Sequence, residues 1–220
     1  MLASLLLSCL SEPDARMSGA VLDSAGQPFP LADIEIRDSM GSLFAEGAAD
    51  AGGAFEIELP PFSTFFAVFS ADGHPPSSFT GFAGDGLFEV ENGTLYLRSA
   101  GELADVAAPF SDCGTGFGMI DGEVRLAIPE QDPSDLPLVE TATATAYGED
   151  GTETAACYDG ESTEGTGESG RYAVFGLPEG VTVLEVGLDL GNGYTESIEH
   201  IVYVPDGGAA PLYPTLFPIP

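Results

Sequence analysis

Short apolar or alternating runs, separated by clusters of Gly, Pro, Asp and Ser, recur along most of this chain of 220 residues. This pattern is typical of a β-sandwich, in which each short strand turns one face toward the core. In the first half it predicts strands near residues 18–22, 33–37, 43–48, 55–59, 65–71, 87–90 and 94–98. Turn residues separate these runs, and Asn92-Gly93 is a strong signal for a tight hairpin. No segment keeps a helical period.

The second half restarts the same pattern after a stretch at 99–116 that reads as a linker with room for one helical turn. Strands are expected near residues 119–128, 139–147, 154–158, 171–175, 181–188 and 197–204. An acidic segment rich in Gly and Thr, at 148–170, is expected to be a surface hairpin or loop. The tail at 206–220 holds Pro211, Pro214, Pro218 and Pro220, which argue against a central strand.

A local signature is shared by the two halves and suggests an internal repeat. Gly-Ala-Phe-Glu-Ile at 53–57 is followed by Leu59-Pro60, and Gly-Arg-Tyr-Ala-Val at 170–174 is followed by Leu177-Pro178. In each case a Gly turn starts a strand whose alternate residues face one side. We therefore expect Phe55, Ile57, Tyr172 and Val174 to be buried in two separate domains, at 17–98 and 117–205.

Composition supports a folded chain with little helix. Hydrophobic residues make up 44%, while 29 Gly and 17 Pro disfavour long helices. The formal net charge of −31 arises because Lys is absent and the only cations are 5 scattered arginines. Such a chain repels phosphate, so nucleic acid and anionic lipid headgroups are excluded as partners. The acidity indicates solubility in a salty or extracellular medium, and calcium binding by acidic loops is the alternative.

The first residues resemble an export signal. Leu2 to Leu7 form an apolar run too short to cross a bilayer, and Leu6-Leu7-Ser8-Cys9 resembles a bacterial lipobox. The resemblance implies lipid attachment at Cys9, with residues 1–16 as signal and tether and the lipid as the only membrane contact. No Lys or Arg precedes Cys9, so either the true start lies upstream or the segment is not a signal. A short apolar strand is the remaining reading.

The cysteine count agrees with this reading. With Cys9 carrying lipid, the 3 cysteines leave one pair, Cys113 and Cys157. Export would place that pair where a disulfide persists, and we expect the two residues to be joined. The alternative is a pair of separate buried thiols.

The repeated signature resembles the carboxypeptidase regulatory-like domain, a prealbumin-type sandwich of bacterial lipoproteins and surface proteins. The residues that follow the family's order are Gly19, Asp23, Gly26, Pro28, Leu31, Ala32, Gly53, Phe55, Leu59, Pro60, Ala67, Phe69, Ala71 and Gly73. The resemblance covers about residues 17–98 and, more weakly, 117–205. It implies an all-β chain of two tandem Ig-like or prealbumin-like β-sandwich domains. The acidic insertion in the second repeat departs from the family's short hairpin.

Motifs for catalysis are missing from the sequence. The only histidines, His74 and His200, lack the spacing of metal ligands, and neither begins the His-Xaa-Xaa-Glu pair of the zinc carboxypeptidases. No Gly-Xaa-Ser-Xaa-Gly elbow or phosphate-binding Gly loop is present. We therefore expect no catalytic residues and no cofactor, with calcium as the one candidate ion.

The sequence leaves three functions open. The first is a non-catalytic, exported surface or envelope lipoprotein that acts as a binding or spacer module, with a protein or carbohydrate partner at the cell surface. The second is a calcium-dependent adhesion or carbohydrate-binding module, in which Phe79, Phe82 and Tyr158 would stack on sugars. The third is an unrecognised hydrolase.

Overall fold

The computed structural model describes residues 15–84, 86–89, 96–113, 118–159, 164–189, 195–212 and 214–218. Its regular structure is almost entirely β-strand, which confirms the all-β prediction. The elements of the first half are β1 (Arg16–Ala20), β2 (Leu22–Asp23), β3 (Asp33–Arg37), β4 (Leu43–Ala48), β5 (Ala54–Glu58), β6 (Thr64–Ala71), β7 (His74–Phe82), β8 (Leu87–Glu89) and β9 (Tyr96–Leu97).

A helix α1 (Ala100–Ala107) and a 3₁₀ helix η1 (Ala108–Cys113) connect the halves. The second half contains β10 (Met119–Ala127), η2 (Pro133–Asp135), β11 (Thr143–Tyr147), β12 (Glu153–Ala155), β13 (Cys157–Tyr158), β14 (Arg171–Phe175), β15 (Gly180–Asp189), β16 (Thr195–Val204), β17 (Ala209–Pro211) and β18 (Thr215–Pro218). Within the described residues no helix is long and apolar enough to span a membrane.

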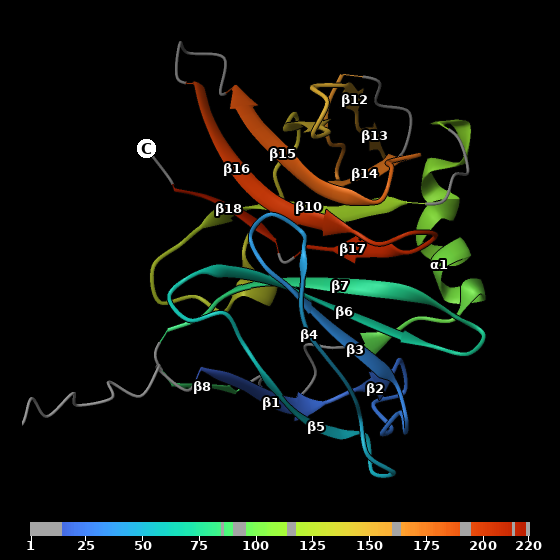
Figure 1. Ribbon diagram of the computed structural model, residues 1–220. Coiled ribbons are helices and arrows are strands. Elements are labelled where there is room, and N and C mark those ends of the chain that lie inside the picture. Colours follow the sequence, from blue (N-terminus) through green and yellow to red (C-terminus); the bar gives the residue numbers. More distant parts are fainter. Residues whose placement is uncertain are drawn as a thin grey trace, which may run out of the picture.

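The two halves have the same strand topology (Figure 1). In the first sandwich β1 pairs with β5 and β8, and β3 pairs with β4 and β6, which continues to β7. In the second sandwich β10 pairs with β14 and β17, and β11 pairs with β12 and β15, which continues to β16. β9 beside β2 and β18 beside β10 complete the correspondence. The repeat suggested by the sequence is therefore a repeat of the fold.

Matching registers relate the halves residue by residue. Gly19 pairs with Phe55 in the first sandwich, and Gly122 pairs with Tyr172 in the second. The turn glycines Gly53 and Gly170 both have positive φ, of 79° and 64°, where a Cβ would strain the backbone. Each accepts a hydrogen bond at 2.9 Å from a valine N–H of the first strand. These shared turns place the two Gly-aromatic strands identically in their sheets.

Each half has its own apolar core. Phe55 and Ile57 are 7% and 8% exposed, while Tyr172 and Val174 are fully buried, so the predicted core positions are confirmed. The first core joins Met17 and Phe55 of one sheet to Ile34 and Phe65 of the other. The second core gathers β10, β14, β15, β16 and β18 around Tyr172.

Three local predictions are wrong. His74, which lies outside the strands predicted from the sequence, begins strand β7, because the irregular pairing between Phe69 and Ala71 accommodates the prolines that follow it. The Pro-rich tail was expected to hold no central strand, yet β17 lies between β10 and β7. Pro211 ends that strand, so its missing N–H interrupts no longer ladder. The linker forms two turns of α-helix and a 3₁₀ helix in place of one helical turn.

The two sandwiches, each with its own core, also pack against each other. β17 of the second sandwich pairs in parallel with β7 of the first through Ala209 and Ser77, which links strands of both halves into one 9-stranded sheet. Figure 1 shows this seam, with β17 directly above β7. The seam positions the residues of the candidate site.

Candidate functional site: the junction of the two sandwiches

Polar and aromatic residues from distant parts of the chain meet at the junction between the sandwiches. The first sandwich contributes a docking face of Phe66, Val68, Ser77 and Ser78. The second contributes a docking end of Val181, Tyr203, Gly208 and Ala209.

A small apolar cluster forms the centre of the junction. Phe66, Val68 and Tyr203 are buried together, with Val181 packed against them. The rings of Phe66 and Tyr203 lie 5.8 Å apart between centroids, within the range of favourable aromatic pairs. Phe66 and Val68 point away from the first core because alternate residues of β6 face opposite sides. The strand is therefore buried on both faces.

Hydrogen bonds fix the register of the seam. The Ser78 hydroxyl donates to the backbone carbonyl of Tyr203 at 2.5 Å. Gly208 comes so close to Pro76 that an added Cβ would lie 2.1 Å from its carbonyl oxygen. Only glycine allows this approach, so the turn before β17 fits tightly against the start of β7.

A charged rim surrounds Tyr203. The guanidinium of Arg37 lies 4.8 Å from the ring centroid, a cation–π contact. The Tyr203 hydroxyl donates to Glu179 at 2.6 Å, and Arg37 lies 3.9 Å from the same carboxylate. Burial, followed by the hydrogen bond to Glu179, raises the pKa of Tyr203 above its usual range. The phenol therefore stays neutral and serves as a donor.

The linker adds a second connection. Arg98, at the end of the first sandwich, forms an ion pair with Asp121 of β10 at 3.1 Å. Ser99 caps α1 in a reciprocal capping box with Glu102. Hydrogen bonds from Ser24 and then from Ser99 lower the pKa of the Glu102 carboxyl to about 2. Phe110 of η1 is buried, with its ring 6.2 Å from Phe175. The linker is thus packed against the second sandwich.

The cysteine predictions have different outcomes. Cys9 lies outside the described residues, so lipid attachment stays a prediction. Cys113 and Cys157 are free thiols in the structure, so the expected disulfide is not formed in it. β13, which holds Cys157, packs against η1, which ends at Cys113. Burial, followed by a hydrogen bond with Cys113, raises the pKa of Cys157 to about 12.

The histidines have structural contacts. The His74 ring packs edge-on against Phe29, with centroids 4.7 Å apart. His200 lies in β16 as expected, with Nε2 at 2.9 Å from the Thr215 hydroxyl, and burial lowers its pKa. Among the residues that the structure describes, no group of three or more His, Cys, Asp or Glu side chains is placed to hold a metal ion.

Only one of the three aromatic residues considered for sugar stacking is exposed. Phe79 packs against the first core and Tyr158 against the second. Tyr158 also accepts a hydrogen bond from the Ala144 N–H at 3.0 Å. Phe82 ends β7 and is 64% exposed.

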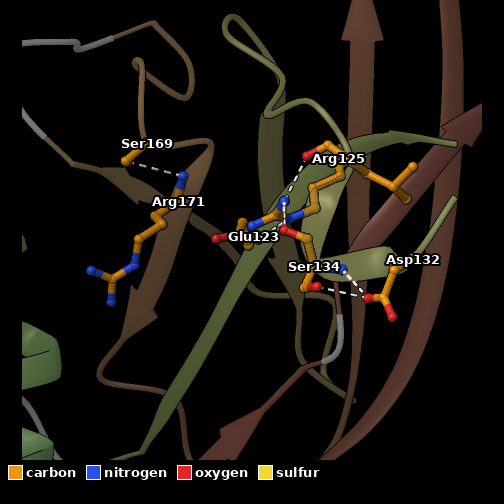
Figure 2. Close-up of polar contacts among 7 residues, drawn as sticks. Glu123, Arg125, Asp132, Ser134, Ser169 and Arg171 are labelled. Carbon is orange, nitrogen blue, oxygen red and sulfur yellow. Dashed lines mark hydrogen bonds and ion pairs between the residues drawn. The ribbon is translucent and has the colours of Figure 1, made fainter. Parts of the chain in front are cut away.

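Arg125 organises the connection from β10 to β11 (Figure 2). Its guanidinium donates to the carbonyls of Ser134 and Leu136 at 3.0 and 2.6 Å and pairs with Glu123. Asp132 caps η2 by accepting from the Ser134 N–H at 2.9 Å and its hydroxyl at 2.7 Å. The Arg125 guanidinium thus holds the loop between β10 and β11 in place.

A hollow of about 350 Å³ lies on the outer face of β11, β15 and β16. This face is opposite the buried residues Ala144 and Val186. Hydroxyl and carboxylate side chains line it, including Thr141, Thr143, Glu185, Asp189, Thr195 and Ser197. The outer face of β15 and β16 is the counterpart, in the second sandwich, of the docking face of the first, and the hollow lies farther along it.

The architecture defines an all-β protein of two tandem Ig-like sandwiches. Neither the known family models nor the curated proteins include a match to the sequence. Among solved structures, the minor pilin GBS52 of Streptococcus agalactiae is 10% identical over 93% of this chain and 96% of its own, with a TM-score of 0.34.

A putative carbohydrate binding protein of Bacteroides uniformis is 11% identical over 88% of this chain and 99% of its own, with a TM-score of 0.31. The Bacillus anthracis TIE protein is 15% identical with a TM-score of 0.29; 92% of this chain aligns, but it spans only 33% of that protein.

Sequence reasoning missed the junction, although one signal for it was present. Residues 65–69 form an uninterrupted apolar run, Phe-Phe-Ala-Val-Phe, and all five are buried. Such a run is typical of a strand covered on both faces, whereas an exposed sandwich face gives alternation. The run therefore marks the strand on which the second sandwich docks.

Proposed function

We propose that this chain is a non-catalytic lipoprotein of the cell surface or envelope, anchored through Cys9, that acts as a binding or spacer module. The observation that carries the proposal is the buried junction. An aromatic cluster, a shared sheet and the Arg98–Asp121 ion pair hold the two sandwiches in one orientation. A unit with fixed orientation between its domains keeps a constant length, which is the property that a spacer needs.

Anchoring is tested by detergent phase partition of the chain expressed with its export signal in a bacterial host. The intact chain should enter the detergent phase, and Cys9→Ser should move it to the aqueous phase. Cys113→Ser is the matched control and should leave the partition unchanged. Equal partition of the Cys9→Ser and intact chains would contradict the anchor.

Spacing is tested by spin-label distance measurements between the sandwiches, with one label on each. The expected result is one narrow distance distribution that broadens in Phe66→Ala, which removes the centre of the junction. A broad distribution in the unaltered chain would contradict a rigid spacer.

Calcium-dependent adhesion remains the alternative to a spacer. Titration with calcium should leave the melting temperature unchanged if the chain is only a structural module, since a ligand that binds the folded state raises it. A clear rise at millimolar calcium would favour the alternative.

A further inference from the structure

The first sandwich carries its own copy of the docking end, and this copy is exposed. The register of β6 and β7 matches that of β15 and β16, and Thr64 of β6 occupies the position of Val181 of β15. Phe82 pairs with Thr64 as Tyr203 pairs with Val181, so Phe82 corresponds to Tyr203. Tyr203 is 3% exposed because it is packed on the other sandwich, whereas Phe82 is 64% exposed.

The turn and strand beside Phe82 correspond as well. The Arg16 N–H donates to the Gly86 carbonyl as the Met119 N–H donates to that of Gly208. Leu87 pairs with Arg16 as Ala209 pairs with Met119. Ala209 is buried at the seam, but Leu87 is 56% exposed. Phe82, Gly86 and Leu87 therefore repeat the docking end, and we call them the free docking end.

The second sandwich carries the matching docking face. Val183 pairs with Ile201 in the second sandwich as Phe66 pairs with Thr80 in the first. Val183 therefore occupies the position of Phe66, and Ile201, which is 47% exposed, occupies that of Thr80. The hollow described above lies farther along this face. Ser197 lines the hollow and is the counterpart of Pro76. In the junction, the Gly208 turn rests against Pro76.

We propose that the free docking end of one copy of this chain binds the outer β15–β16 face of a second copy, repeating the internal junction between molecules. Phe82 of one copy packs on Val183 and Ile201 of the next, and Gly86 enters the hollow. The contact joins different surfaces of the two copies, so it is heterologous and extends head to tail.

Charge opposes this contact and makes it dependent on salt. Glu185 and Glu199 lie opposite each other on the receiving face, where the first sandwich has Val68 and Ser78. The whole chain carries −31, so copies repel one another at low ionic strength. Screening by salt weakens this repulsion, so association should strengthen as salt is raised.

Sedimentation velocity over a range of concentrations in molar salt tests the proposal, using the full chain with all three cysteines replaced by Ser. Head-to-tail oligomers should grow with concentration. Phe82→Ser should weaken association by about tenfold or more, since buried aromatic anchors dominate interfaces. Glu199→Gln should strengthen it by removing one of two facing carboxylates. Circular dichroism checks that each variant folds, which is expected because both side chains are exposed.

Cross-linking tests the register of the contact. In the same background, a Phe82→Cys chain mixed with a Val183→Cys chain should give a heterodimer with a short bifunctional maleimide. A Phe44→Cys chain mixed with the Val183→Cys chain is the control, since Phe44 is 46% exposed but lies on β4. Equal yields for the two mixtures would overturn the register.

Three outcomes overturn the proposal. The first is a chain that stays monomeric at all concentrations and salt levels. The second is association that Phe82→Ser does not change. The third is a monomer that sediments with neutral phosphatidylcholine vesicles and loses that binding in Phe82→Ser, which would show that a lipid surface covers the free docking end.

Discussion

Gly122 lies opposite Tyr172 on the neighbouring strand, and the phenol fills the space that a side chain at position 122 would need. A Cβ on Gly122 would lie 2.4 Å from the Tyr172 hydroxyl oxygen. Tyr172 is fully buried, so its ring cannot move into solvent to make room. The Gly-aromatic pair is thus a packing requirement of the second sandwich.

Replacement of Gly122 by Ala should therefore destabilise the second sandwich. Overpacking of a core typically lowers the free energy of unfolding by about 1–3 kcal/mol, and we expect a loss in that range by denaturant titration. Gly101→Ala is the control, because the nearest atom to its added Cβ is 3.9 Å away in the first turn of α1. A Gly122→Ala chain as stable as the unaltered one would contradict the packing.

Phe66 and Phe65 are neighbours that face different cores, which allows a matched comparison. Phe66→Ala should weaken the junction, so that calorimetry resolves two unfolding transitions where the unaltered chain shows one. Phe65→Ala removes a fully buried ring from the first core and should lower the stability of that sandwich by about 3–5 kcal/mol.

The two substitutions differ in the face of β6 that they change, since Phe66 faces the junction and Phe65 faces the first core. If Phe66→Ala melts in a single transition, or if the unaltered chain already melts in two, the junction does not couple the sandwiches.

Cys113 and Cys157 should form a disulfide under oxidising conditions, because the elements that hold them, η1 and β13, pack against each other. A bond that closes a loop of about 45 residues would stabilise the folded chain by roughly 4 kcal/mol on the chain-entropy model. The pKa of Cys157, about 12, leaves little thiolate at neutral pH. Bond formation should therefore accelerate as pH rises, as measured by mass spectrometry after acid quenching.

Cys157→Ser is the control for this prediction and should show no change in stability with oxidant. Free thiols in the exported chain, or a bond that leaves the unfolding free energy unchanged, would contradict it.

His200 should make stability depend on pH. Burial lowers its folded pKa, so below its unfolded value of 6.5 the unfolded chain binds a proton that the folded chain does not. This contribution to stability is complete above pH 6.5 and is lost as pH falls from there to the folded pKa. His200→Gln should remove that part of the slope in unfolding titrations between pH 7 and 5. An identical slope in both chains would show that His200 is not the group responsible.

Much of the fold could be predicted because strand signals are local. The strands at 33–37, 43–48 and 171–175 have the predicted bounds, since alternation and flanking turn residues mark them clearly. β7 and β17 were missed because Pro75, Pro76 and Pro211 suggested breaks, whereas irregular pairing and strand ends accommodate them.

The apolar run at 65–69 marks the docking strand, but the residues that it contacts could not be predicted, because they lie far away in the sequence. Ser78 and Tyr203 are separated by 125 positions, and their hydrogen bond exists only once both sandwiches have formed. Neither residue type is unusual in a strand, so nothing local marks the pair. The cysteines differ in this respect, since their parity and small number suggested a pairing, and the structure packs η1 against β13 but leaves both thiols free.

The position of β17 in the sequence has a consequence for synthesis and export. Residues 209–211 complete the seam with β7, yet they follow β10, β11, β14, β15 and β16 of their own sandwich. A chain that emerges from its N-terminal end can therefore bury the first core long before the docking face is covered. During that interval Phe66 and Val68 form an apolar surface open to other chains, which favours aggregation of incomplete molecules. Chaperone protection would be needed most while the second sandwich is still emerging.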